Sequence, residues 1–182
     1  MTQEIRIPNE RIAVIIGKQG QTRRYLEKQM NVSLKVDSDD GIVTITNADD
    51  PVSEIRSMDP IKAIGRGFSP QHALKLFDDE DNVLDVIDLS DDANTPQKLY
   101  RIRGRIIGKS GKSREQIENM TNTYISIFGK TVGIIGSPDH VANAREAILM
   151  LIGGSDHSTV FKFLDQKNKK AKLDVMNYYY SK

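Results

Sequence analysis

Two six-residue segments of the chain have almost the same sequence, and both have the composition of a phosphate-binding loop. They are Ile15-Ile16-Gly17-Lys18-Gln19-Gly20 and Ile106-Ile107-Gly108-Lys109-Ser110-Gly111. The glycines let a ligand approach the backbone closely, and the polar run after each segment starts a helix whose N-terminus attracts anions. Because the pattern occurs twice, it indicates a duplicated module that binds nucleic acid.

The charges of the chain support this interpretation, although the net charge of the 182 residues is only +1. Residues 11–26 and 93–114 contain no Asp or Glu, and each stretch holds one glycine segment. Local charge matters more than net charge for attracting a polyanion. The second stretch supplies five candidates for phosphate contacts: Arg101, Arg103, Arg105, Lys109 and Lys112.

Composition excludes several other classes of protein. The chain has no cysteine, which excludes disulfides and thiolate zinc sites and favours the reducing cytoplasm. No apolar run is long enough to span a membrane, and the first residues lack a signal-peptide pattern. We expect a cytoplasmic protein without metal, cofactor or membrane partner.

Hydrophobic periodicity predicts the elements that position the first glycine segment. The expected order is strand, helix, glycine turn, helix, two strands and a helix, with Asn9 as the first N-cap. The corresponding ranges are 4–8, 10–16, 17–20, 21–30, 32–36, 42–45 and 51–64. Residues 39–41, Asp-Asp-Gly, predict a hairpin turn between the two strands.

The second half of the chain repeats the same order. The expected ranges are 83–88, 96–107, 108–111, 112–120, 124–128, 131–135 and 138–151. A short helix is expected between the copies at 72–77, and an amphipathic helix ending in a run of lysines at 158–172. The alternation of helices and antiparallel strands predicts the α+β class.

This order of elements, with Ile-Ile-Gly-Lys-x-Gly between the first two helices, resembles the type I KH domain. The resemblance implies two such domains, each a three-stranded antiparallel sheet backed by three helices. They would occupy 1–68 and 82–154, with a linker helix at 69–81 and a C-terminal helix and basic tail at 155–182.

KH domains clamp about four nucleotides of single-stranded RNA or DNA, with the glycine loop against the backbone. By resemblance the clamps are Gly17, Lys18, Gln19 and Gly20 in the first copy and Gly108, Lys109, Ser110 and Gly111 in the second. Ile16 and Ile107 would line the apolar floor beneath the bases.

Further segments resemble the archaeal version of the Dim-two, or partner-of-Nob, proteins of small-subunit ribosome assembly. They include Lys62-Ala-Ile-Gly-Arg-Gly-Phe68, the run Gly104 to Lys112, Ala144-Arg-Glu-Ala-Ile148 and Ser158-Thr-Val-Phe-Lys-Phe163. The resemblance implies binding near the 3′ end of the small-subunit rRNA precursor. It also implies the Nob endonuclease and the alpha subunit of archaeal initiation factor two as partners. In eukaryotic relatives the first glycine loop is degenerate, whereas Gly17 and Gly20 are both present here.

Other functions stay open at this point. A KH protein can act on mRNA or single-stranded DNA, and the acidic first half could dock a partner protein with only weak RNA contact. A nucleotide hydrolase is excluded because its phosphate-binding loop needs four residues between the glycines, whereas Gly104 and Gly108 enclose three.

Two charged segments also allow two interpretations each. The acidic run Asp78 to Asp81 could hold magnesium, but it fits a loop or an acidic partner surface better. The lysines of 167–172 either solvate a terminal helix or extend the RNA track.

Overall fold

The computed structural model describes residues 2–47 and 49–181, and it contains two three-stranded antiparallel sheets. The first sheet has the order β1-β3-β2 and the second the order β4-β6-β5. The strands are β1 (Thr2–Arg6), β2 (Ser33–Asp37), β3 (Ile42–Thr46), β4 (Val83–Asp88), β5 (Tyr124–Phe128) and β6 (Thr131–Gly136). The predicted α+β class and the two sheets are confirmed.

The helices before and after the first glycine loop agree with the sequence pattern. They are α1 (Asn9–Ile16) and α2 (Gln21–Met30), joined by a short 3-10 turn, η1 (Lys18–Gly20). Two local predictions are wrong. Asn9 lies inside α1, with Pro8 at the cap position, and β1 ends at Arg6 rather than at Pro8. Proline has no N–H to donate to a strand, but its φ suits the start of a helix.

The predicted helix 51–64 is two helices, α3 (Pro51–Arg56) and α4 (Met58–Gly65). The break lies at Ser57, whose buried hydroxyl donates to the carbonyl oxygen of Ser53 at 2.6 Å. Pro60 lies in the first turn of α4. A proline is tolerated there but not in a helix interior, so one continuous helix is disfavoured.

The segment expected as one linker helix at 72–77 also differs. It forms two four-residue helices, α5 (Pro70–Ala73) and α6 (Lys75–Asp78). Ala73, Leu74 and Leu76 are buried in the hydrophobic core of the first half of the molecule. The segment is therefore a packed layer of the fold.

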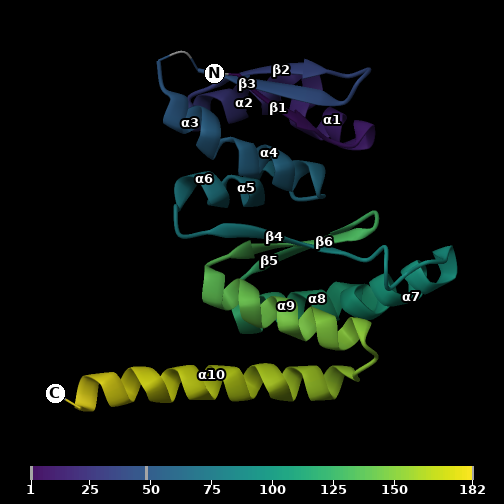
Figure 1. Cartoon of the computed structure of the whole chain (residues 1–182), viewed down its shortest axis with the longest axis vertical. Helices are drawn as coiled ribbons and strands as arrows, with labels where there is room; N and C mark the ends of the chain where they lie inside the picture. Colours follow the sequence, from purple (N-terminus) through teal and green to yellow (C-terminus); the bar gives the residue numbers. More distant parts are fainter. Residues whose placement is uncertain (1, 48, 182) are drawn as a thin grey trace.

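The second copy follows the predicted order closely. Its helices are α7 (Pro96–Ile107), η2 (Lys109–Gly111), α8 (Lys112–Thr121) and α9 (Pro138–Ile152), followed by α10 (His157–Tyr180). Thr95 caps α7, since its hydroxyl accepts from the Lys98 N–H at 3.2 Å. The last helix is longer than the expected 158–172 and extends past the body of the molecule (Figure 1).

The elements stack in layers, as Figure 1 shows from top to bottom: the first sheet, helices α4 to α6, the second sheet, helices α7 to α9, and α10. One face of the second sheet packs on α8 and α9, and its other face packs on the middle layer. Ile134 of β6 accordingly belongs to the core of the second domain, and the next residue, Ile135, to that of the first.

The contact between the domains is close at Gly133. A Cβ on this residue would lie 2.6 Å from a ring carbon of Phe68, so only glycine fits without a shift of the ring. In residues 2–47 and 49–181, no helix combines the length and the apolar character needed to cross a membrane.

Candidate nucleic-acid interface

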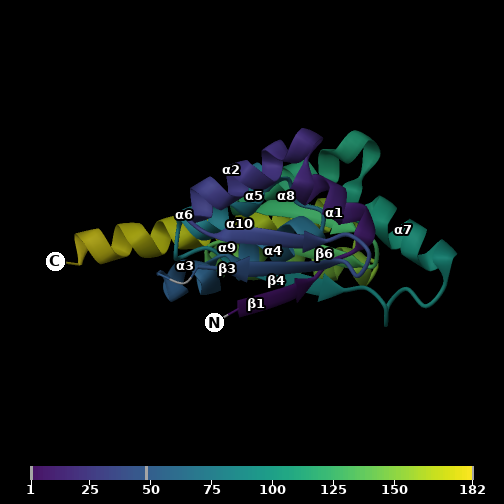
Figure 2. The same ribbon diagram turned by 90° about the horizontal axis from the view of Figure 1, so that it is seen from above.

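The two glycine loops have nearly the same backbone conformation. Gly17 has φ 68° and ψ 179°, and Gly108 has φ 72° and ψ 179°. The third loop residue is left-handed in both copies, with φ 52° at Gln19 and 54° at Ser110. In Figure 2 the α1–α2 turn and the α7–α8 turn lie on the same side of the molecule. The duplication in sequence is thus a duplication of loop geometry.

The first glycine of each loop is required by its surroundings. An added Cβ would lie 2.1 Å from Thr22 Oγ1 at Gly17 and 2.5 Å from Ser113 Cβ at Gly108. These contacts are far too short for a side chain, so the start of each loop packs tightly on the helix that follows it. Both residues also have a positive φ, which disfavours other residue types.

The surroundings of the last glycine differ between the two loops. At Gly111, in the described part of the chain, no heavy atom lies within 4 Å of an added Cβ. At Gly20, Arg24 Nη1 lies 3.3 Å from that position, and Arg24 Nη2 donates to the Gln19 carbonyl oxygen at 3.0 Å. The two last glycines are both half-buried, and they differ in that the end of the exposed Arg24 side chain lies beside Gly20.

Each isoleucine pair divides between core and surface. Ile15 and Ile106 are fully buried, while Ile16 and Ile107 are half-buried. The side chains at the two central loop positions are partly or fully exposed in both copies: Lys18, Gln19, Lys109 and Ser110. In both copies a half-buried isoleucine thus comes directly before a loop whose two central side chains are exposed.

The remaining basic candidates lie in two different settings. Arg101 and Lys112 are exposed and Arg103 is half-buried, all beside the second loop on α7 or α8. Arg105, by contrast, donates from Nη2 to the Ser155 carbonyl oxygen. Its own carbonyl oxygen accepts from His157 Nε2 at 2.7 Å. Arg105 therefore fixes the start of α10 instead of extending toward the loop.

Sequence reasoning missed the neighbours that α10 brings to the second loop. His157 and Phe161 of α10 line a cavity of about 220 Å³ together with Lys109 and Lys112. Helix α10 follows the second copy in the chain and brings His157 and Phe161 to that loop. A lone histidine beyond the repeat gives no sequence signal for this placement.

A repeated carboxylate, also missed, holds the helix after each loop against the neighbouring strand. Glu27 Oε1 accepts from the Leu34 N–H at 2.9 Å, and Glu118 Oε1 accepts from the Ile125 N–H at 2.7 Å. An arginine four residues before each glutamate, Arg23 or Arg114, lies 4.0 Å away. These contacts set the position of α2 and α8 against β2 and β5.

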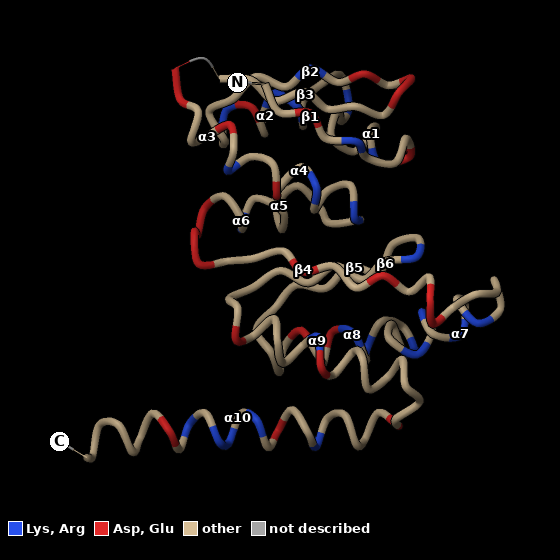
Figure 3. The backbone as a smooth tube through the Cα atoms, viewed as in Figure 1, with Lys and Arg blue, Asp and Glu red and all other residues tan. Residues whose placement is uncertain are grey.

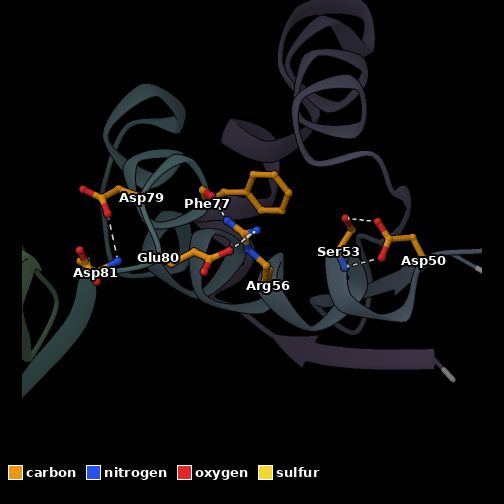
Figure 4. Close-up of polar contacts among 7 residues, drawn as sticks. All are labelled: Asp50, Ser53, Arg56, Phe77, Asp79, Glu80 and Asp81. Atoms are coloured by element: carbon orange, nitrogen blue, oxygen red, sulfur yellow. Dashed lines mark hydrogen bonds and ion pairs between the residues drawn. The ribbon is translucent and has the colours of Figure 1, made fainter.

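The acidic segments have structural contacts. Figure 3 shows the acidic segment Asp78 to Asp81 between α6 and β4, far from the lysines of α10. There, Glu80 pairs with Arg56 at 2.8 Å, and Asp79 Oδ1 accepts from the Asp81 N–H at 3.0 Å (Figure 4). Among the described residues, no group of three or more His, Cys, Asp or Glu side chains is placed to hold a metal ion.

Comparison with known proteins agrees with this geometry. A KH domain model matches residues 2–58, and a model of the eukaryotic type KH domain, type I, matches residues 83–169. A KH domain-containing protein of Methanocaldococcus jannaschii is 43% identical over 92% of this chain and 74% of its own length. Dim2p of Pyrococcus horikoshii is 41% identical to the chain. The chain belongs to the Dim2, or PNO1, family of proteins with two KH domains.

Structures and eukaryotic relatives of this family are similar to the chain along most of its length. The match to Dim2p of Pyrococcus horikoshii has a TM-score of 0.84 and covers 91% of this chain and 99% of that one. The same organism provides a complex of a/eIF2alpha, aDim2p and rRNA, with 40% identity, a TM-score of 0.86 and coverage of 93% and 95%. The pre-rRNA-processing protein PNO1 of Saccharomyces cerevisiae is 31% identical over 75% of this chain, which spans 50% of the yeast protein.

Proposed function

We propose that this chain is a non-catalytic factor of small-subunit ribosome assembly that binds single-stranded rRNA near the 3′ end of the precursor. The loop Gly108 to Gly111 is the principal RNA site. The observation that carries this assignment is the difference between the last glycines. At Gly111 no atom of the described chain beyond its neighbours lies within 4 Å of an added Cβ, whereas at Gly20 the end of the Arg24 side chain lies 3.3 Å from that position.

Charge supports the same choice of loop. Arg101, Arg103, Lys109 and Lys112 lie in the second loop or on the helices that flank it, in a stretch without acidic residues. Phosphate contacts from such residues position the strand, while the groove beside the loop receives unpaired bases. The relatives named for pre-rRNA processing and the rRNA complex of the Pyrococcus protein favour rRNA over mRNA or single-stranded DNA.

The proposal includes two protein partners from the same assembly pathway. The Pyrococcus complex contains a/eIF2alpha together with aDim2p, and the alpha subunit of initiation factor two is accordingly a proposed partner here. A Nob-type endonuclease is the other, because the chain resembles the partner-of-Nob proteins.

The deciding experiment is a footprint on purified small-subunit rRNA, with the wild type and with the double variant Lys109→Asp/Ser110→Asp. Removing a charge-assisted hydrogen bond costs about 1.5–3 kcal/mol of binding free energy. We therefore expect the variant to bind about a hundredfold more weakly. The matched control is Lys18→Asp/Gln19→Asp in the first loop, which should cost less.

Three outcomes of this experiment would count against the proposal. An unchanged dissociation constant in the folded double variant would exclude the second loop as the site. Scattered protection over the rRNA would favour an mRNA or single-stranded DNA protein. No protection at all would favour a protein adaptor.

A further inference from the structure

A cavity of about 500 Å³ lies where the second domain meets the middle layer of helices. One wall is α8, with Arg114 and Asn119, and the floor is the turn from Asn122 into β5. The remaining wall comes from outside the KH order of elements, from His72 of α5. The cavity follows the same helix that starts at the second glycine loop.

Its most specific feature is a stacked aromatic pair. The rings of His72 and Tyr124 have centroids 4.3 Å apart and an angle of 27° between their planes. Tyr124 is half-buried against the core of the first domain, while His72 is exposed. Because the rings stack on each other, each covers one face of its partner, and both residues line the cavity.

The duplication provides an internal comparison. The first domain has a cavity of about 510 Å³ at the corresponding place, beside Glu27, Asn31 and Ser33. Asn31 and Asn122 both have a left-handed backbone, with φ 54° and 51°. Two residues after each asparagine, the first copy has Ser33 and the second copy has Tyr124. The cavity is thus a repeated feature of the fold, and the aromatic surface is specific to the second copy.

The chemistry of this cavity suits a base better than a phosphate. The cation among the described residues that line it, Arg114, lies 4.0 Å from Glu118, and Glu115 adds further negative charge. Asn119 and Asn122 bring amide groups, each with donors and an acceptor for the edge of a base. Aromatic side chains are the usual stacking platforms for bases of single strands.

We propose that this cavity binds one nucleobase of the RNA, beyond the nucleotides held in the groove of the second domain. The exposed His72 ring, held in place by its stack on Tyr124, supplies the stacking surface, and Asn119 contacts the base edge. Asn119 lies seven residues after Lys112, about 10 Å along α8 at 1.5 Å per residue. A strand clamped at Gly108 to Gly111 therefore reaches the cavity by following α8. This inference rests on the proposed function, because it extends the same RNA track.

The test compares a tetranucleotide with RNAs that carry one or two further nucleotides at the 5′ or the 3′ end. Stacking on an aromatic side chain contributes about 1–3 kcal/mol per base. One of the extensions should therefore improve wild-type affinity about tenfold. In His72→Ala and in Tyr124→Ser, which restores the residue of the first copy, the gain should fall to less than threefold. His140→Ala, at an exposed position of α9, is the matched control.

A second readout reports stacking of the base directly. A 2-aminopurine placed at the added position should lose fluorescence when it stacks in the wild type, and should keep it in His72→Ala. If the tetranucleotide binds but no extension improves affinity, the inference is wrong and the aromatic pair is only packing between the domains. A gain that persists in both variants would also overturn it. If neither short nor long RNA binds, the proposed function itself fails.

Discussion

The guanidinium of Arg11 lies 5.5 Å from the centre of the Phe128 ring, and this contact joins the two KH domains. Arg11 belongs to α1 of the first domain, and Phe128 ends β5 of the second. The same guanidinium donates to the carbonyl oxygens of Ile64 and Phe68, each at 2.8 Å. Burial lowers the pKa of Arg11 by desolvation. The two carbonyl oxygens and the ring face act in the opposite direction, because they stabilise the charged form of the guanidinium.

Replacing Arg11 by Ala should lower the free energy of unfolding by about 2–3 kcal/mol, because hydrogen bonds from charged groups contribute about 1.5–3 kcal/mol each. Urea denaturation measures this change. Arg6→Ala is the control, since Arg6 is exposed and makes one hydrogen bond of 3.3 Å. The Arg6 change should stay within about 0.5 kcal/mol. Equal effects of the two substitutions would contradict a stabilising role for Arg11.

The two glycines of the second loop should respond differently to alanine. Gly108→Ala brings a Cβ to 2.5 Å from Ser113 Cβ, so it should destabilise the fold by several kcal/mol. Gly111→Ala meets no atom of the described chain and should cost only the left-handed strain of about 1–2 kcal/mol. Because the added methyl occupies the open face of the loop, Gly111→Ala should nevertheless weaken RNA binding. Thermal melts of both variants measure the loss of stability, and binding isotherms measure the RNA affinity. An unaffected RNA affinity in Gly111→Ala would show that RNA does not approach there.

Salt should weaken RNA binding in a defined way. We expect Arg101, Arg103, Lys109 and Lys112, together with neighbouring groups, to make about three to five phosphate contacts. The slope of log association constant against log salt concentration for a single strand is then roughly −2 to −3.5. Titrations at several salt concentrations give the slope directly. A slope near zero would favour the protein-adaptor function. Duplex RNA should compete poorly with single strands, because the groove receives unpaired bases.

Truncation after Asn168 separates the two roles considered for the tail. It keeps Val160 and Leu164, which are buried, and the bond from Asn168 Nδ2 to the Met120 carbonyl oxygen at 2.9 Å. The melting temperature should therefore change little, since exposed charges contribute little to stability. If the lysines of 169–172 extend the RNA track, a long RNA should bind several-fold more weakly and a tetranucleotide unchanged. Equal decreases in affinity for both RNAs would instead mean that the tail supports the groove.

The start of α10 should lose stability in acid. Asp156 caps this helix, and the hydrogen bonds from Thr159 and Ser158 lower the pKa of its carboxyl group. A lowered folded pKa contributes stability above the unfolded value of about 3.9 and loses it as pH falls through the folded value. We expect the melting temperature of the wild type to exceed that of Asp156→Asn near pH 6. The difference should narrow toward pH 3, and a constant difference would contradict this linkage.

Much of the site could be predicted because its signals are local. The glycine pattern, the isoleucine pair and the helix Gln21–Met30 each depend on neighbouring residues, and the structure has them where the pattern places them. The break at Ser57 and the packing of residues 69–81 depend on contacts distant in the chain, which periodicity does not encode. Arg105 shows the same limit: charge suggested a phosphate contact, but the fold brings Ser155 and His157 to it. The pairing of His72 with Tyr124 likewise exists only once both domains are assembled.

The middle layer has a consequence for how this protein can be divided or can evolve. Ile135 and Gly133 of the second sheet face Phe68 and the helices α5 and α6, so either half alone would expose an apolar surface to water. A fragment that begins at residue 82 should therefore self-associate even though a complete KH match lies within it. Length changes at 69–81 would alter the spacing of the two glycine loops as well. The length of the segment between the repeats thus sets the distance between the two glycine loops.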